Sequence, residues 1–329
     1  MSSSRPVASV SLDLDNHWSY LKTHGDPRWA DRPSYLDVVV PRALDVLDRA
    51  GVTATFFVVG HDAATPEGQK LVGQLAEAGH EVENHSFEHE PWFHRFDDER
   101  VLDELTRTEE AIEAATGRRP VGFRGPGYSV TPTLLSMLAD RGYRYDASSL
   151  PTWIGPLARA YYFRSAKLTA EQREERANLF GSFRDVARPL GPYRWDLPGG
   201  RSLLELPVTT FPALRVPMHV SYVLYAEGVN SKLARLYFAA ALTACRALRV
   251  APSLLLHPLD VISADDAPSA GLDFFPGMGL PGARKRDLVV DCLERMQQHW
   301  HVGPMSAHVD ALAARSDLRR KDPASLAQT

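Results

Sequence analysis

The sequence predicts an α/β fold, specifically a distorted (β/α) barrel of seven or eight strands. Two observations support this prediction. Short apolar runs that resemble strands alternate with helical patterns along the chain, and a polar motif follows several of these runs. Repeated strand–helix units are typical of a parallel sheet, and this number of units favours a closed barrel over an open sheet. In such a barrel the carboxyl ends of the strands share one face, where catalytic groups gather.

The alternation is clearest in the first half of the chain. Val, Thr and aromatic residues dominate the apolar runs, as expected of buried strands. The helical patterns between them end at Gly51, Gly79 and Gly117, because glycine readily adopts the left-handed conformation that closes a helix. Strands are therefore predicted at residues 7–14, 52–59, 80–84, 121–124 and 143–146, with helices at 33–50, 66–78 and 97–116 and another starting at 131–132.

After the fifth strand the rhythm breaks. Residues 156–201 are polar and contain one short helical pattern at 169–178, so we interpret them as an insertion on the barrel. The alternation then resumes, with strands expected at 203–207, 253–256 and 301–305 and helices at 231–248, 284–299 and 306–315. The sequence thus predicts one barrel domain over residues 1–315 and a flexible polar tail over 316–329.

Composition narrows the function classes. The net charge of −4 provides no broad basic field, so nucleic-acid binding is not expected. No stretch reaches the ~18 continuous apolar residues that a transmembrane helix needs, and the N-terminus resembles no secretory signal. Cys245 and Cys292 fall in helical patterns with apolar neighbours, which suits buried thiols in a reducing compartment. We therefore expect a cytoplasmic protein.

Two motifs suggest a metal site. Asp13-Leu-Asp15 ends the first strand, and residues i and i+2 of a strand face the same side. His85 and His89 are four residues apart, which would bring both imidazoles to one side of a helical turn. Asp15, His85 and His89 would match the two-histidine, one-carboxylate pattern of catalytic metals, with Asp13 free as a base.

Three further positions complete this set. Arg124 ends a strand before Gly-Pro-Gly and could pair with Asp13. His257, after four apolar residues, could act as a general acid, with Asp146 or Asp260 as its orienting carboxylate.

Each motif alone has an ordinary structural explanation. The histidine pair could be two surface residues, and Asp15-Asn16 could cap a loop. Arg124 could lie beside a simple glycine-proline turn, and His257 could be a hydrogen-bonded core histidine. Only the ordered combination of the motifs favours catalysis.

That combination resembles the polysaccharide deacetylase family, also called the NodB-homology or carbohydrate esterase 4 group. It is most similar to a cytoplasmic branch with Helicobacter-type peptidoglycan deacetylases and allantoinase-like proteins. The resemblance runs from about residue 7 to 259. It implies the NodB-homology barrel, a divalent metal, usually Zn²⁺ (Ni²⁺, Co²⁺ or Mn²⁺ being alternatives), and hydrolysis of an N-acyl group on an amino sugar. Similar proteins form homo-oligomers, so self-association is expected.

The resemblance also implies a role for each matching residue. Asp13 would be the base, Asp15, His85 and His89 the metal ligands, Arg124 the tether of the base, Gly127 an oxyanion amide, Asp146 the support of the acid and His257 the acid. The chain departs from the common pattern in two places: Leu14 separates the acidic pair, and Tyr128 comes one place late after Arg124.

The substrate is predicted only by class, as an N-acylated amino sugar or sugar conjugate. Tyr128, Trp18 and His61 follow strand ends and are candidate substrate contacts. Three alternatives stay open: a deformylase, an allantoinase-like enzyme that opens a cyclic amide, and a sugar-binding barrel without catalysis.

Overall fold

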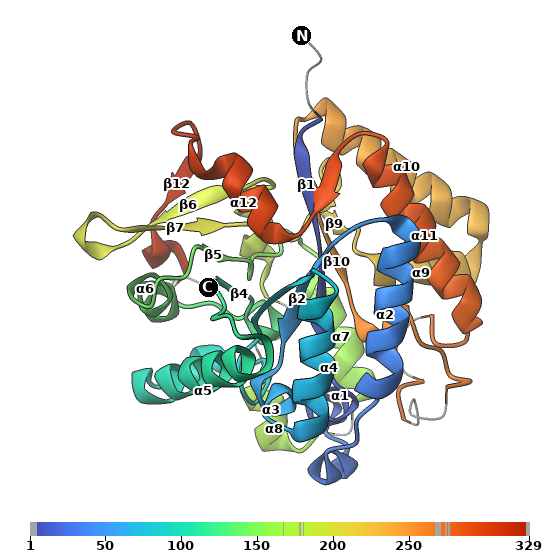
Figure 1. The fold of residues 1–329 in the computed structure, drawn as a ribbon, viewed down its shortest axis with the longest axis horizontal. Helices are drawn as coiled ribbons and strands as arrows, with labels where there is room; N and C mark the ends of the chain where they lie inside the picture. The colour runs from blue at the N-terminus through green and yellow to red at the C-terminus, as the bar shows by residue number, and fades with distance from the viewer. Residues whose placement is uncertain are drawn as a thin grey trace.

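A computed structural model describes residues 5–166, 168–177, 179, 181–266, 271–273, 275 and 277–326 (Figure 1). The strands are β1 (Val7–Leu14), β2 (Thr55–Val58), β3 (Glu81–Asn84), β4 (Gly122–Phe123), β5 (Tyr145–Asp146), β6 (Tyr193–Asp196), β7 (Ser202–Glu205), β8 (Thr210–Phe211), β9 (Val216–Pro217), β10 (Ser253–Leu256), β11 (His301–Gly303) and β12 (Arg319–Lys321).

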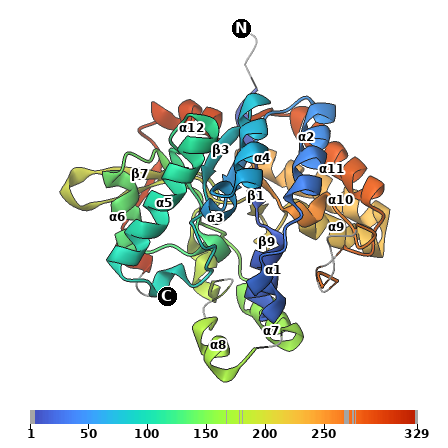
Figure 2. The ribbon, with the colours of Figure 1, turned by 60° about the horizontal axis from the view of Figure 1, so that its bottom comes forward.

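The helices cover the outside of the sheet (Figures 1 and 2). They are α1 (His17–His24), α2 (Leu36–Ala50), α3 (Gly60–Ala63), α4 (Pro66–Glu77), α5 (Asp98–Thr116), α6 (Pro132–Asp140), α7 (Gly155–Ser165), α8 (Ala170–Glu175), α9 (Val220–Val229), α10 (Ser231–Ala247), α11 (Gly282–Gln297) and α12 (Met305–Ala313). In the described part of the chain, none of them combines the length and apolar character that a bilayer crossing requires.

The main sheet runs in the order β10-β1-β2-β3-β4-β5-β7-β6-β12, and every pair in it except β6–β7 is parallel. The chain after β7 links the two sides of this array. Leu206 donates its N–H to the carbonyl of Asp146 (2.9 Å), and Thr209 donates to that of Ser253 in β10 (3.0 Å). The predicted α/β barrel is therefore confirmed, with an irregular seam where short backbone contacts replace a regular strand pair.

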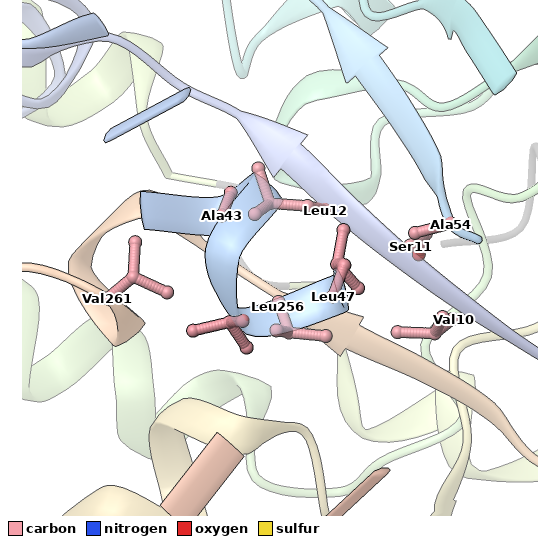
Figure 3. Close-up of a pocket in the computed structure, with 9 residues that line it drawn as sticks. Val10, Ser11, Leu12, Ala43, Leu47, Ala54, Leu256 and Val261 are labelled. Carbon is pink, nitrogen blue, oxygen red and sulfur yellow. The ribbon is translucent and has the colours of Figure 1, made fainter. Parts of the chain in front are cut away.

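The two faces of β1 contact different parts of the fold, the helices outside the barrel and the polar groups inside it. Val10 and Leu12 pack with the apolar stripe of α2, whereas the alternating residues Ser11 and Asp13 face the opposite side, as the period of a strand requires. A void of about 10 Å³ lies between β1 and α2 (Figure 3), and its lining is almost entirely apolar. A space of this size barely holds one water, so this void is not a ligand site.

The structure corrects the expected end of the insertion. Residues 193–196, which we assigned to the insertion, form β6 and pair antiparallel with β7. Tyr193 and Trp195 are buried while Asp196 is exposed. This alternation is the signature of a strand with one buried face, and the surrounding polar residues obscured it.

The predicted flexible tail over 316–329 is wrong for most of its length. Residues 319–321 form β12, which pairs parallel with β6. Leu318 and Leu326 are buried on either side of β12. Backbone pairing with an edge strand does not need apolar side chains, which is why composition alone suggested fraying. Residues 327–329 lie outside the described residues.

Candidate active site

The predicted site residues follow the carboxyl ends of four parallel strands. Asp13 is the second-last residue of β1. His85 follows β3, Arg124 follows β4 and His257 follows β10. Because parallel strands present their carboxyl ends at one edge, the fold gathers these side chains on one face.

Asp15, His85 and His89 converge on a common point. Oδ1 of Asp15 lies 3.2 Å from Nε2 of His85 and 2.9 Å from Nε2 of His89, and all three side chains are buried. One ligand atom from each residue lies within 4.8 Å of the others. The sequence predicted this cluster, and the structure brings its three members together.

The donor set fits a divalent metal ion. Although Asp15 Oδ1 is close to both imidazoles, no hydrogen bond reaches this buried atom from any described residue. Two imidazole nitrogens and a carboxylate oxygen thus crowd one buried point, as ligands around one ion do. A tetrahedral ion about 2.0–2.1 Å from each donor would hold them roughly 3.3 Å apart, close to the spacing observed.

A neighbouring carbonyl fixes the orientation of His85. Nδ1 of His85 lies 2.6 Å from the backbone oxygen of Arg124, which can only accept a hydrogen bond. The proton is therefore on Nδ1, and the lone pair of Nε2 faces Asp15. Metal-binding histidines commonly use their second nitrogen in this way.

The electrostatics of the cluster favour an ionised carboxylate. Burial alone would raise the pKa of Asp15, but the imidazoles of His89 and His85 outweigh it and lower that pKa on balance. Burial lowers the pKa of His85, while Asp13 and Asp15 oppose it and produce a net increase. The cluster thus favours an ionised carboxylate at Asp15.

The segment between the two histidines is a loop, so the predicted helical turn is wrong. Ser86 and His89 have φ values of 61° and 48°, in the left-handed region. The buried carboxylate of Glu104 on α5 stabilises this loop by accepting hydrogen bonds from the N–H groups of Phe87 (2.7 Å) and Glu88 (2.9 Å). The histidines therefore converge through a strained loop and a carboxylate on another helix, and their spacing does not indicate either feature.

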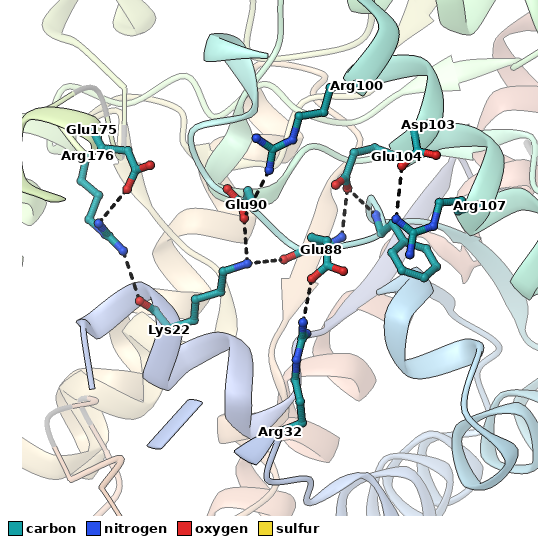
Figure 4. A network of polar contacts seen from close by, with 11 residues as sticks. Lys22, Arg32, Glu88, Glu90, Arg100, Asp103, Glu104, Arg107, Glu175 and Arg176 are labelled. Carbon is teal, nitrogen blue, oxygen red and sulfur yellow. Dashed lines mark hydrogen bonds and ion pairs between the residues drawn. The ribbon is translucent and has the colours of Figure 1, made fainter. Parts of the chain in front are cut away.

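Ion pairs clamp the outside of the same loop (Figure 4). Lys22 on α1 pairs with Glu90 at 2.8 Å and donates to the carbonyl of Glu88, whose side chain pairs with Arg32 at 2.9 Å. These contacts tie the loop to the segment that follows β1. The ligands from β1 and β3 are thus held in one unit.

Asp13 is paired with a fully buried arginine. Nη1 of Arg124 lies 2.5 Å from Oδ1 of Asp13 and 2.9 Å from Oγ of Ser11. The guanidinium also stacks over Phe57, with 4.2 Å to the ring centroid. The side chain of Arg124 therefore holds Asp13 as predicted, and its backbone holds His85.

The Gly-Pro-Gly turn after Arg124 packs tightly against Pro91, close to the metal-ligand candidate His89. Gly127 has a φ of 60°, and a Cβ atom at this position would lie 2.9 Å from the Cβ of Pro91. The N–H of Tyr128 donates to the carbonyl of Gly125 (2.9 Å) inside the turn. Backbone and packing thus already account for glycine here, and the oxyanion role of Gly127 stays a prediction.

His257 contacts a serine and is close to Asp260. Its Nδ1 lies 3.2 Å from Oγ of Ser221 on α9, and its backbone N–H donates to Oδ2 of Asp260 (2.8 Å). Within the described part of the chain, no hydrogen bond or ion pair joins Asp146 to His257. Strand β5 directs Asp146 towards Ser148 and Glu205, so its role as support of the acid stays a prediction.

Asp146 and Glu205 form a buried carboxyl pair on neighbouring strands, with both side chains fully buried. Burial raises the pKa of both groups, and the charge of Asp146 raises the pKa of Glu205 further. The hydrogen bond between them lowers the pKa of Asp146 and raises that of Glu205, so Glu205 is the member that keeps its proton.

This pair predicts a stability that depends on pH. Above about pH 4 the unfolded carboxyl groups lose protons that the folded pair retains. The free energy of unfolding should therefore fall as the pH rises from about 4 towards the raised pKa, by up to about 1.4 kcal/mol per pH unit for each retained proton. Asp146→Asn removes the negative charge that raises the pKa of Glu205 and should therefore flatten this dependence. Urea unfolding of both proteins between pH 4 and 8 measures it, and parallel curves would contradict the assignment.

Two predicted substrate contacts are less accessible than expected. Trp18 is only 1% exposed and donates its Nε1–H to Asp62 (2.8 Å), so it has no free face for a sugar. His61 packs edge-on against Trp18 and Phe87. Both residues pack beside the loop after β1, and their contact with substrate stays a prediction. Tyr128 remains a candidate: burial raises the pKa of its hydroxyl, and the nearby charges of Asp13 and Asp15 raise that pKa further.

No sequence pattern singles out three further residues near the site. His219, at the start of α9, lies edge-on to His257 with 5.4 Å between ring centroids, and burial lowers its pKa well below the usual value. Ser221 contacts His257 as described above. The hydroxyl of Tyr20 is buried. Its burial raises its pKa, and the charges of Asp15 and Asp260 raise that pKa further. None belongs to a recognisable motif, so only the fold reveals them.

Comparison with known proteins agrees with the motifs. Residues 29–145, which include His85, His89 and Arg124, match the family model for polysaccharide deacetylase. A peptidoglycan deacetylase-like protein, FGM2, from Gibberella zeae is 34% identical over 148 residues, covering 43% of this chain and 43% of that protein. A peptidoglycan deacetylase from Helicobacter pylori is 30% identical over 162 residues, covering 48% of this chain and 53% of that protein. The matched segments thus span about half of each relative.

The fold extends the similarity to the whole chain. A crystal structure from Mycobacterium smegmatis, provisionally assigned as a polysaccharide deacetylase, superimposes with a TM-score of 0.62 at 23% identity. The superposition covers 98% of this chain and 95% of that one. The ordered motifs and the segment over residues 29–145 are thus similar to the polysaccharide deacetylase family, and the fold of the whole chain is similar to that of the Mycobacterium smegmatis protein.

Proposed function

We propose that this protein is a metal-dependent hydrolase that removes an N-acetyl group from an amino sugar. The observation that carries the proposal is the convergence of Asp15, His85 and His89 beside Asp13, which a buried arginine holds. Both named relatives described above are peptidoglycan deacetylases or similar to them, which supports the substrate class.

Asp15, His85 and His89 would hold the ion, with Zn²⁺ as the first candidate for two nitrogens and one carboxylate. When bound, such an ion polarises the acyl carbonyl and lowers the pKa of water. The three protein ligands leave a coordination position for water and substrate, which distinguishes a catalytic set from a closed structural one.

Asp13 is suited to be the general base. Arg124 occupies its Oδ1, which leaves Oδ2 to accept a proton from the attacking water. Because Asp13 is two residues from Asp15, the base and the ligand share one rigid strand end. Positioning of this kind lowers the entropic cost of the attack.

His257 is suited to be the general acid. An amine is a poor leaving group unless it is protonated, so amide cleavage needs a donor opposite the base. His257 follows β10, which pairs with the side of β1 away from β2 and β3, whereas His85 follows β3. Acid and metal ligands therefore approach from different strands. A backbone amide near Gly127 would stabilise the developing oxyanion.

Release of small carboxylic acids tests the reaction class. Purified protein with Zn²⁺, Co²⁺, Ni²⁺ or Mn²⁺ should release acetate from N-acetylglucosamine oligomers or peptidoglycan fragments. N-formyl amino sugars and allantoin serve as comparison substrates. Preferential formate release or allantoin opening would indicate one of the other C–N hydrolases. Glycan binding without release of any product from metal-loaded protein would contradict the proposal.

The compartment is part of the same proposal. Cys245 and Cys292 are both buried and free. Burial raises the pKa of both thiols, that of Cys245 to about 12, which disfavours the reactive thiolate. Such thiols are compatible with a reducing compartment, and we propose that the protein acts in the cytoplasm on soluble or lipid-linked amino sugars.

A further inference from the structure

A hydroxyl group connects His257 to a buried carboxylate. Oγ of Ser221 lies 2.8 Å from Oδ1 of Asp260 and 3.2 Å from Nδ1 of His257. Asp260 is fully buried, and Ser221 is 5% exposed. The three groups therefore form a continuous row from the carboxylate through the hydroxyl to the imidazole.

The number of protons available in this row determines the direction of its two hydrogen bonds. Ser221 donates its single hydroxyl proton to Oδ1 of Asp260 at 2.8 Å. The oxygen of Ser221 is then left as an acceptor, and Nδ1 of His257 must supply the second proton. The imidazole is thus held with its proton on Nδ1, which leaves Nε2 as the nitrogen that gains and loses a proton.

Asp260 holds the same histidine from a second direction. Its Oδ2 accepts the backbone N–H of His257 at 2.8 Å. The short 3₁₀ turn over residues 258–260 brings the carboxylate back to the start of its own segment. Both oxygens of Asp260 therefore restrain His257, one through the backbone and one through Ser221.

We infer that Ser221 and Asp260 are the positioning residues of the general acid in this protein, acting as an Asp–Ser–His relay that sets the tautomer of His257. The inference rests on the proposed function for the role of His257 as acid. The relay takes the place that the resemblance implies for Asp146, which points elsewhere.

The surroundings suit a relay that carries charge. When His257 is protonated, the negative charge of Asp260 stabilises the imidazolium through the shared hydroxyl. Lys285 on α11 donates to the carbonyls of Leu259 and Ile262 (2.7 Å for Ile262), which fixes the loop that carries Asp260. His219 lies on the other side of the ring, and burial keeps it neutral, so it adds no competing charge.

The tautomer can be observed directly by ¹⁵N NMR of the full-length labelled protein. The His257 signals are assigned by comparison with His257→Gln. The wild type should show neutral His257 with the proton on Nδ1. Ser221→Ala should move His257 towards the Nε2–H form, which predominates in free imidazole side chains, and Ser221→Thr should restore the Nδ1–H form. An Nε2–H form in the wild type, or an unchanged tautomer in Ser221→Ala, would overturn the inference.

Kinetics provide the second readout. Ser221→Ala and Asp260→Asn should each lower kcat for acetate release from N-acetylglucosamine oligomers by about 10–100-fold, with KM little changed. The loss should be much smaller with 4-nitrophenyl acetate, whose leaving group needs no protonation. Ser136→Ala on α6 serves as the control, because it removes a serine hydroxyl that donates to the backbone carbonyl of Pro132. Equal losses on both substrates would contradict a role in positioning the acid.

The two readouts separate the relay from the proposed function. If the wild type releases no acetate yet shows the Nδ1–H tautomer and its loss in Ser221→Ala, the relay stands and the deacetylase proposal fails. If acetate is released but the tautomer is the same in all variants, the relay fails and the deacetylase proposal stands.

Discussion

Replacing Asp13 by asparagine is expected to lower kcat for N-deacetylation by roughly 10²–10⁴-fold, the usual contribution of a general base. The asparagine Oδ1 can still accept the hydrogen bond from Arg124, but the amide nitrogen that replaces Oδ2 cannot accept a proton from water. The shape of the side chain is kept, so the loss reports chemistry more than packing. Initial rates of acetate release measure it.

The control for this variant is a measurement of its metal content. Asp13 is not among the three converging residues, so metal content should be the same as in the wild type. Activity within a few-fold of the wild type would exclude Asp13 as the base. Loss of the ion together with activity would instead indicate that Asp13 helps to hold it.

Replacing Arg124 by methionine is expected to lower the free energy of unfolding by about 3–5 kcal/mol, the typical cost of breaking a buried ion pair. Arg124 is 0% exposed, and its removal leaves Asp13 as a buried charge without its partner. Arg107→Met is the matched control, because its ion pair with Asp103 is exposed. An exposed pair contributes about 0–1 kcal/mol.

A double variant separates charge from packing in this prediction. Asp13→Asn combined with Arg124→Met removes both charges, so its loss should be smaller than the sum of the two single losses. Urea unfolding of the four proteins provides the comparison. Additive losses, or an Arg124→Met cost no larger than that of Arg107→Met, would show that the pair does not stabilise the fold.

The sequence predicted the fold well where the periodicity was strong. The strands at 7–14 and 253–256 and the helices at 66–77 and 231–247 agree with the expected ranges within about a residue. It failed where tertiary context decides the structure. Tyr193 and Trp195 alternate as a strand should, but lie among arginines, prolines and glycines that favour a loop.

The candidate site was predictable to the extent that its residues lie in motifs. Asp15, His85 and His89 follow strand ends, and barrel topology is enough to bring such positions together. The supports of the site are different. Glu104 and Ser221 lie on helices far along the chain from the groups they hold, and no local pattern distinguishes them from ordinary helix residues.

Asp146 illustrates the limit of transferring roles by resemblance. Its position after a strand matches the family pattern, yet its side chain forms a carboxyl pair with Glu205, while Asp260 lies beside His257. The direction of a side chain depends on the neighbouring strand, and one sequence does not report that direction.

The central claim is that Asp15, His85 and His89 together hold one divalent ion that the reaction requires. Isothermal titration of chelator-treated protein with Zn²⁺, followed by an acetate-release assay, tests it most directly. The account predicts one ion per chain, activity that returns in proportion to the ion added, and loss of both in His85→Ala and His89→Ala. Full activity in metal-free protein, or unchanged binding in both variants, would contradict it.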